Sequence, residues 1–177
     1  MTSSLLRQHS LKKEALAARL RAATGGEAGP VGLAKETSNL FRDREGAPRR
    51  RLDVSEFNQV LAIGEGALEA EGMITYEALT RECLRHGVMP AVVPQLKTIT
   101  LGGAVAGVGI ESSSHRCGLV HDTMLELDVL IGDGRVLTCT AENEHADLFF
   151  GFPNSYGTLG YALRIKARTV PVKPYVR

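Results

Sequence analysis

The feature that most constrains this chain is a run of small residues, TLGGAVAGVGIESSS, at positions 100–114. Thr100 is a good helix N-cap, and Gly102 and Gly103 would then lie in the first helical turn. Because glycine has no Cβ, backbone N–H groups there can approach an anion directly, and the helix dipole favours negative charge. Two interpretations stay open: phosphate or dinucleotide binding, and a tightly packed helix whose small residues let two elements touch.

Composition excludes several classes of protein. Of the 177 residues, 44% are hydrophobic and 23% are charged, which suits one globular domain or two small lobes that share a ligand. With 21 Lys+Arg against 20 Asp+Glu, the net charge of +1 gives no field that would attract nucleic acid. No apolar run reaches roughly 18 residues, so no transmembrane segment is expected.

The cysteines and histidines indicate no metal site. The three cysteines lie far apart and form no CxxC pair, so neither a zinc site nor a disulfide framework is expected. The five histidines show no metal-ligand spacing, and the predicted metal content is none. Because the charged N-terminus lacks the apolar region of a secretory signal, the expected location is the cytoplasm.

Helical patterns occur at four places. The first predicted helix begins with Ser10 as N-cap and ends at Gly25-Gly26. Its basic residues are predicted to form a solvated face: Lys12, Lys13, Arg19 and Arg21. The other predicted helices are 75–86, capped by Thr75 and stopped by Gly87, a segment that starts at Thr100, and a short capped helix over 143–150, closed by Gly151.

Strand patterns fill much of the remainder. They cover 31–34, 51–54, 60–63, 68–71, 125–131, 136–140 and 161–168. In 125–131, the apolar residues at odd positions alternate with Glu126 and Asp128, which predicts a half-buried strand with both acids on the outer face. Gly132-Asp-Gly134 predicts a hairpin turn. Pro90 and Pro94 are expected to interrupt regular structure and to mark a seam near 90–98.

Most motifs that would carry chemistry are incomplete. The pattern G-x-G-x-x-G fails at every candidate position, a Walker A loop and H-E-x-x-H are absent, and Pro153 stands where a nucleophile elbow needs glycine. Two further segments fit a dinucleotide site. Ala34-Lys-Glu-Thr-Ser-Asn39 is a polar, donor-rich loop after a strand, and Tyr156-Gly-Thr-Leu-Gly160 places two glycines before the last strand, although either could be an ordinary loop.

These three segments, in this order, resemble the FAD-binding domain of the p-cresol methylhydroxylase/vanillyl-alcohol oxidase superfamily. Within it, IESSSH (110–115), the hairpin LDVLIGDGRVLTCT (127–140) and GTLG (157–160) resemble the Δ24-sterol reductase family. TSNLFR (37–42), VVPQLKTITLGGAV (92–105) and GFPNSYGTLGY (151–161) resemble bacterial FAD-linked oxidoreductases related to that family.

The resemblance implies a set of cofactor-binding residues in four segments. Positions 35–39 would lie beside the pyrophosphate of FAD, 100–107 on it, 110–114 along the ribityl chain and ring, and 157–161 would close the site. The residues carried over are Lys35, Thr37, Ser38, Asn39, Thr100, Leu101, Gly102, Gly103, Gly107, Ile110, Glu111, Ser112, Ser113, Ser114, Gly157, Gly160 and Tyr161. No catalytic residue is predicted, and His115, near the expected ring, is assigned a structural role.

The resemblance also implies an α+β fold of two lobes with FAD between them. The predicted organisation is an N-terminal helix over 1–28, a first FAD-binding lobe over 29–97 and a second over 98–177. Because the first-lobe loop has no histidine, the FAD is expected to be non-covalent. Relatives carry a C-terminal substrate domain, expected to be absent here, and a membrane anchor of the animal reductase is not carried over.

Two functions follow from the resemblance. The first is the FAD-binding domain of an FAD-linked oxidoreductase, with hydride transfer to or from flavin and reduction or oxidation of a C=C bond in an unidentified, sterol-like small molecule. The alternative is a truncated flavin-binding module without its own catalysis, which needs a partner chain or a missing domain. A third hypothesis, a ligand-free fragment, predicts an exposed face that aggregates.

Overall fold

The structure is a computed structural model that describes residues 2–24, 31–34, 50–64, 66–173 and 175. Within these residues it mixes helices and sheet, as predicted for an α+β protein. The helices are α1 (Thr2–Thr24), α2 (Tyr76–Arg85), α3 (Leu101–Gly107), α4 (Ser114–Cys117), the 3₁₀ helix η1 (His121–Thr123) and α5 (Ala146–Gly151). The strands are β1 (Val31–Ala34), β2 (Arg50–Asp53), β3 (Val60–Gly64), β4 (Ala67–Glu71), β5 (Val88–Pro90), β6 (Met124–Leu130), β7 (Val136–Cys139) and β8 (Tyr161–Pro171).

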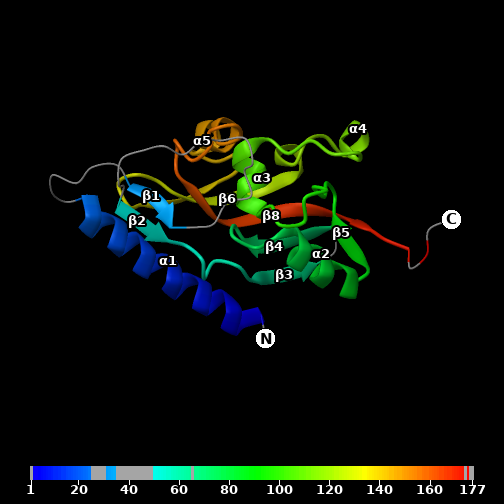
Figure 1. Cartoon of the computed structure of the whole chain (residues 1–177), viewed down its shortest axis with the longest axis horizontal. Helices are drawn as coiled ribbons and strands as arrows, with labels where there is room; N and C mark the ends of the chain where they lie inside the picture. Colours follow the sequence, from blue (N-terminus) through cyan, green and yellow to red (C-terminus); the bar gives the residue numbers. More distant parts are fainter. Residues whose placement is uncertain (1, 25–30, 35–49, 65, 174, 176–177) are drawn as a thin grey trace.

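One six-stranded sheet organises the described residues. Its order is β3-β4-β8-β6-β7, with β5 also paired to β8, and every pairing is antiparallel. The long strand β8 crosses the middle of the molecule (Figure 1). Leu68 of β4 pairs with Ala167 of β8, and Leu127 of β6 pairs with Ile165. A separate parallel pair joins β1 and β2.

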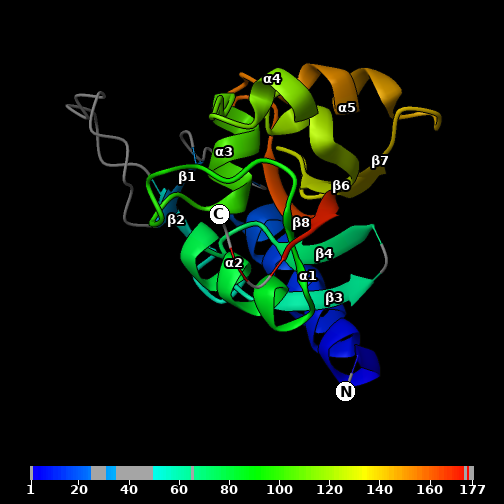
Figure 2. The same ribbon diagram turned by 90° about the vertical axis from the view of Figure 1, so that its right-hand side faces the viewer.

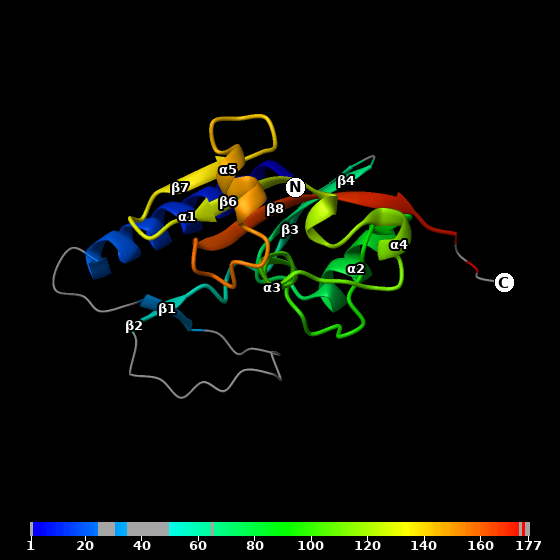
Figure 3. The same cartoon turned by 90° about the horizontal axis from the view of Figure 1, so that it is seen from above.

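Helices cover the sheet from two sides. Figure 1 shows α1 below the sheet and α3 and α5 above it, and the view from above (Figure 3) places α5 over β6 and α1. The larger apolar cluster packs α2 and α3 against the sheet and includes Leu79, Val105 and Ile165. A smaller cluster packs Leu16 and other α1 residues against Leu163 and the residues around β2. Apolar burial on both sides of the sheet therefore holds the fold together.

The first helix begins earlier than predicted, and its basic face is solvated only in part, because Arg19 and Arg21 are exposed whereas Lys12 and Lys13 are half-buried. It starts at Thr2, and Ser10 lies inside it, where its hydroxyl donates to Leu6 O instead of capping the helix. Lys12 and Lys13 pair with the buried carboxylates of Glu71 and Asp128. Tertiary contacts with the sheet stabilise the first two turns, which carry no strong helix signal of their own.

Strand β6 departs from simple alternation. Glu126 and Asp128 share one face as predicted, but Asp128 is buried because Lys13 of α1 covers it, and Leu125 is exposed. The pairing of β6 with β8 shifts register between Met124 and Glu126 and again between Asp128 and Val129. The first shift leaves Leu125 as an extra residue on β6, whereas Glu126 and Asp128 both pair with Arg164 and therefore still share one face.

Two smaller differences concern element ends. Pro90 closes the short strand β5, which pairs with β8, so only Pro94 lies outside regular structure. Helix α5 starts at Ala146, because the Asn143 side chain accepts from the amides of Thr140 and His145 in the preceding turn. The other predicted strands, the N-cap at Thr75 and the hairpin turn at Gly134, with φ of 83°, are confirmed.

Candidate functional site

Three of the four predicted cofactor segments come together on one side of the sheet. Figure 2 shows α3, α4 and α5 gathered there, with residues 108–114 between α3 and α4. The loop after α5 reaches α3, because the Tyr156 amide donates to Ala106 O over 3.0 Å. The fourth segment, with Lys35, Thr37, Ser38 and Asn39, lies outside the described residues.

The first turn of α3 starts as predicted, with Thr100 as N-cap. The Thr100 hydroxyl accepts from the Gly103 amide over 3.2 Å. The amides before it have main-chain partners, because Leu101 N donates to Ile74 O over 2.9 Å and Gly102 N donates to Gly72 O over 2.8 Å. These two hydrogen bonds hold the start of α3 against the segment that connects β4 and α2.

Gly102 and Gly103 differ in what surrounds them. A Cβ on Gly102 would lie 2.9 Å from Gly72 O, a main-chain atom that cannot move aside. A Cβ on Gly103 would meet only the Thr100 hydroxyl, also at 2.9 Å. Close packing of two main chains therefore explains Gly102, whereas Gly103 keeps open space beyond its own cap. Of the predicted cradle, Gly103 therefore offers open space at the N-terminal end of α3, while its amide already donates to Thr100.

The segment from Ile110 to Ser114 combines an apolar side chain with hydroxyls. Ile110 is 71% exposed, which is unusual for isoleucine. Ser113 Oγ donates to Ala91 O over 3.1 Å, and Ser114 Oγ accepts from the Glu111 amide over 3.0 Å. Ser112 is exposed, and its carbonyl lies 2.9 Å from His115 Nδ1. An exposed isoleucine beside a serine cluster fits a ligand with a flat apolar ring and a hydroxylated chain.

The closing loop relies on backbone that only glycine adopts easily. Gly157 has φ of 86° and Gly160 has φ of 141°, and both values are positive, which residues with side chains rarely adopt. A Cβ on Gly160 would lie 2.5 Å from Leu130 O, so the start of β8 packs directly against β6. Tyr161 begins β8, and its ring lies 3.2 Å from the position of a Cβ on Gly157.

Sequence reasoning missed Tyr156 as a structural residue of this site. Its hydroxyl donates to Gly107 O over 3.3 Å, and its ring lies 3.5 Å from where a Cβ on Gly107 would stand. Tyr156 has φ of 50°, and Val108, at the end of α3, has φ of 59°. Left-handed backbone costs L residues about 1–2 kcal/mol each, so both residues are held by their surroundings. The only signal in the sequence was an aromatic residue directly before the first glycine of the loop.

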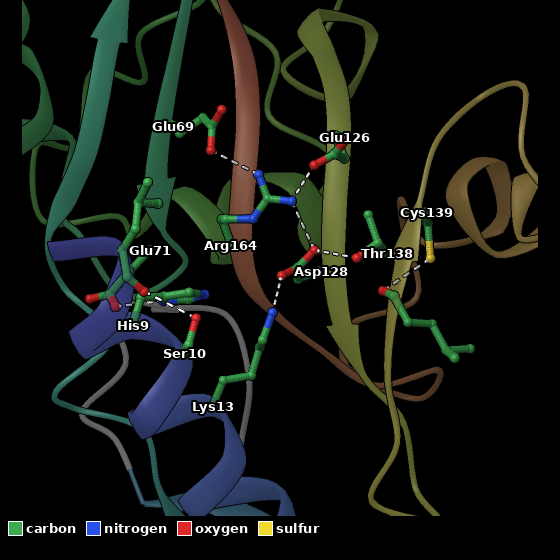
Figure 4. Close-up of polar contacts among 12 residues, drawn as sticks. His9, Ser10, Lys13, Glu69, Glu71, Glu126, Asp128, Thr138, Cys139 and Arg164 are labelled. Carbon is green, nitrogen blue, oxygen red and sulfur yellow. Dashed lines mark hydrogen bonds and ion pairs between the residues drawn. The ribbon is translucent and has the colours of Figure 1, made fainter. Parts of the chain in front are cut away.

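A buried charge network lies beneath the sheet, between it and α1 (Figure 4). Glu71 is 0% exposed, and its carboxylate lies 2.8 Å from His9 Nδ1 and 2.8 Å from Lys12 Nζ. Asp128 accepts from Lys13 over 2.8 Å and from Arg164 over 3.0 Å, and Arg164 also pairs with Glu126. Paired on all sides, these carboxylates anchor α1 instead of offering a base to a substrate.

The pKa values of the two buried acids follow from these contacts. Burial alone would raise the pKa of Glu71, but hydrogen bonds from His9, Lys12 and the Gln59 amide outweigh it and lower the value. Burial would likewise raise the pKa of Asp128, and hydrogen bonds from Arg164 and Lys13 bring it down to about 2. Both acids therefore stay ionised at neutral pH.

A cavity of about 530 Å³ lies away from the predicted site. Leu5 of α1, Val60 and Ile63 of β3, and Glu82 and His86 at the end of α2 contribute to its lining. It contains none of the predicted cofactor residues. Among the residues that the structure describes, no cluster of three or more His, Cys, Asp or Glu could hold a metal ion, and no helix is long and apolar enough to cross a membrane.

A comparison with protein families now places the chain. A family model described as an FAD binding domain matches residues 12–140, which include α3, the 110–114 segment and the β6–β7 hairpin. The chain therefore belongs to the FAD-binding domain family. This match was predicted from the same motifs, and it covers the polar loop at 35–39 as well.

Individual relatives refine the placement. The chain is 34% identical over 137 residues to Delta(24)-sterol reductase of Pisum sativum, which covers 76% of this chain and 24% of the relative. It is 36% identical over 110 residues to the human Delta(24)-sterol reductase, covering 62% of this chain and 21% of the relative. Cytokinin dehydrogenase 6 of rice is 33% identical over 134 residues, with 74% and 24% covered. The chain thus spans about a quarter of the length of these relatives.

Proposed function

We propose that this chain binds FAD non-covalently, as the two-lobed cofactor domain of an FAD-dependent oxidoreductase. The observation that carries the proposal is the family match across 12–140, a stretch that includes two of the donor-rich segments. The arrangement of α3, the 110–114 segment and the closing loop on one side of the sheet supports it. In this proposal the boundary between the lobes falls near residue 97, and residues 1–28 form a helical cover.

The proposed roles follow from the chemistry of each segment. Gly103 and the 35–39 loop would contact the diphosphate, because the positive end of a helix and a lysine suit its charge. Ile110 and the three serines from 112 to 114 would lie along the ring and the ribityl chain, and Gly157 to Tyr161 would close over them. Bound FAD supplies two-electron, hydride-level redox chemistry. The residues of this chain bind and orient the FAD, and none of them is proposed as a catalytic acid or base.

We further propose that the substrate is an apolar small molecule with a C=C bond, sterol-like in character, and that the cytoplasm is where the protein acts. The similarity to proteins named Delta(24)-sterol reductase supports this substrate class. A further domain or a partner chain would supply the substrate-binding surface. The alternative is a flavin-binding module without its own catalysis.

A flavin titration tests the proposal. We expect saturable, one-to-one quenching of FAD fluorescence, and much weaker binding of FMN, which lacks the diphosphate bridge. Gly103→Asp places a carboxylate in the proposed cradle and should raise the Kd for FAD at least tenfold, or about 1.4 kcal/mol. Gly132→Asp is the matched control, because a Cβ on Gly132 meets nothing within 4 Å. Absence of FAD binding at high micromolar concentration would overturn the proposal.

Turnover separates the two functional alternatives. An oxidoreductase that is complete in this chain would show a substrate-dependent change in the reoxidation of dithionite-reduced flavin. A cofactor module that binds FAD with no such change would support the alternative, in which catalysis needs a further domain or partner.

A further inference from the structure

The end of helix α3 is capped by a residue that lies far along the chain. The last carbonyls of a helix lack partners inside it and need donors from elsewhere. The Ala104 carbonyl accepts from the amides of Val108 and Gly109. Two further carbonyls near the end of the helix, those of Ala106 and Gly107, accept from the amide and the hydroxyl of Tyr156, over 3.0 and 3.3 Å.

Both sides of this contact hold unusual backbone. Val108, which ends α3, and Tyr156 both have left-handed φ, which L side chains rarely adopt. The Tyr156 ring lies against Gly107, 3.5 Å from the position of the missing Cβ, so a larger residue at 107 would press on the ring. Burial does not explain this conformation, because Tyr156 remains 47% exposed. The two hydrogen bonds and the contact with Gly107 contribute to holding the tyrosine in its place.

We propose that Tyr156 is a positioning residue for the flavin site, an inference that rests on the proposed function. It fixes the closing loop, 157–160, to the C-terminal end of α3. The segment proposed to lie on the diphosphate and the loop proposed to close over the ring then keep one spacing. A ligand that contacts two segments binds more tightly when their spacing is set before binding, because less freedom is lost.

Two substitutions separate the parts of the contact. Tyr156→Phe keeps the ring and the amide but removes the hydroxyl bond to Gly107. Tyr156→Gly suits the left-handed backbone and keeps the amide but removes both ring and hydroxyl. Tyr175→Phe is the matched control, because it likewise removes a tyrosine hydroxyl, but from a side chain that is 86% exposed.

The experiment combines hydrogen exchange of the free protein with FAD titration and visible circular dichroism of the bound flavin. For Tyr156→Phe we expect faster exchange in both 153–160 and 104–108 and a Kd for FAD raised about 2- to 10-fold, the range for one lost hydrogen bond. Tyr156→Gly should weaken binding further and alter the flavin dichroism. Tyr175→Phe should behave as wild type.

The outcomes separate this inference from the proposed function. If wild type binds FAD and both Tyr156 variants match it in Kd and dichroism, the positioning role is overturned while the proposed function stands, even if exchange is faster. If hydrogen exchange is unchanged in both variants, Tyr156 does not fix the closing loop to α3, and the inference is overturned. If wild type binds no FAD, the proposed function is overturned and the positioning role with it.

Discussion

At the scale of single residues, the tightest constraint is a meeting of three main chains. The amide of Gly72 donates to Leu163 O in β8, and the carbonyl of Gly72 accepts from Gly102 N in α3. A Cβ on Gly72 would lie 2.0 Å from Ala162 O, much closer than any real contact. One glycine thus joins the end of β4, the start of β8 and the first turn of α3.

Replacement of Gly72 should be costly. Gly72→Ala should lower the free energy of unfolding by about 2–3 kcal/mol or more, because the β-carbon cannot be accommodated without a shift of β8. Gly132→Ala should change stability by less than about 1 kcal/mol, since open space surrounds that position. Urea unfolding followed by far-UV circular dichroism measures both. Equal midpoints for the two variants would contradict the close approach.

The cysteines should differ in reactivity. Burial raises the pKa of the Cys83 and Cys139 thiols to about 11, with smaller contributions from the charges of Glu82 and Asp128. Cys117 is only partly buried. Iodoacetamide at pH 7.5 should therefore modify Cys117 first, and mass spectrometry of tryptic peptides reports the order. Modification of Cys83 or Cys139 at the same rate in the folded protein would disprove this expectation.

At the scale of elements, local patterns predicted where helices and strands lie in the chain better than which of their residues are buried. Alternating apolar residues placed β8 and the β6–β7 hairpin correctly, and Thr75 and Thr100 marked two helix starts. The early turns of α1 escaped prediction because contacts such as His9 with Glu71, far along the chain, hold them. The burial of Asp128 was not predicted because α1, which covers it and supplies Lys13, lies more than a hundred residues earlier in the chain.

The contact between α1 and the sheet should weaken in acid. Asp128 has its pKa lowered from 3.8 to about 2 in the folded protein, so its ionised form stabilises the fold by about 2 kcal/mol above pH 4. That contribution is lost as the pH falls from about 4 toward 2, where the carboxyl becomes protonated in both states. Chemical unfolding at a series of pH values measures it.

A substitution identifies the group responsible. Asp128→Asn should lower stability at neutral pH and reduce the loss of stability between pH 4 and 2. Asp133→Asn is the control, because this acid pairs with Arg135 on the exposed β6–β7 turn, where screening by water makes the pair weak. The same acid sensitivity in Asp128→Asn as in wild type would assign the effect to other carboxylates.

At the scale of the whole molecule, β8 joins the two apolar clusters. Leu163 belongs to the cluster beneath α1, and Ile165, two residues on, belongs to the cluster beneath α3. Neither cluster can lose its packing without disturbing the strand that the other depends on. We therefore expect the described core to unfold as one cooperative unit.

Unfolding of Leu16→Ala tests this cooperativity. The substitution empties a buried position in the smaller cluster and should cost about 2–4 kcal/mol. Native-state hydrogen exchange should then show the amides of α2, in the larger cluster, losing protection by the same free energy. Loss of protection confined to α1 and β2 would instead mean that the smaller cluster opens by itself.

The candidate site could be assembled from the sequence only in part. Positions 100–114 and 157–161 carry a recognisable order of small and hydroxyl residues. Their spacing along the chain, however, does not predict that the two segments lie in contact. The contact between Tyr156 and Ala106 brings them together. Likewise, a helix start at Thr100 indicated free amides, whereas the partners of Leu101 and Gly102 come from the β4–α2 connection, which no local pattern reveals.

The central place of β8 has a consequence for synthesis. Leu68 of β4 pairs with Ala167 of β8, about a hundred residues later in the chain, and β6 pairs with the same strand. Both strands therefore lack this neighbour until β8 has been synthesised. On the ribosome, the β3–β4 and β6–β7 hairpins emerge with the edges of β4 and β6 still unpaired, and such edges favour association between chains. A nascent chain therefore stays vulnerable to aggregation until β8 has been synthesised and inserts between the two hairpins.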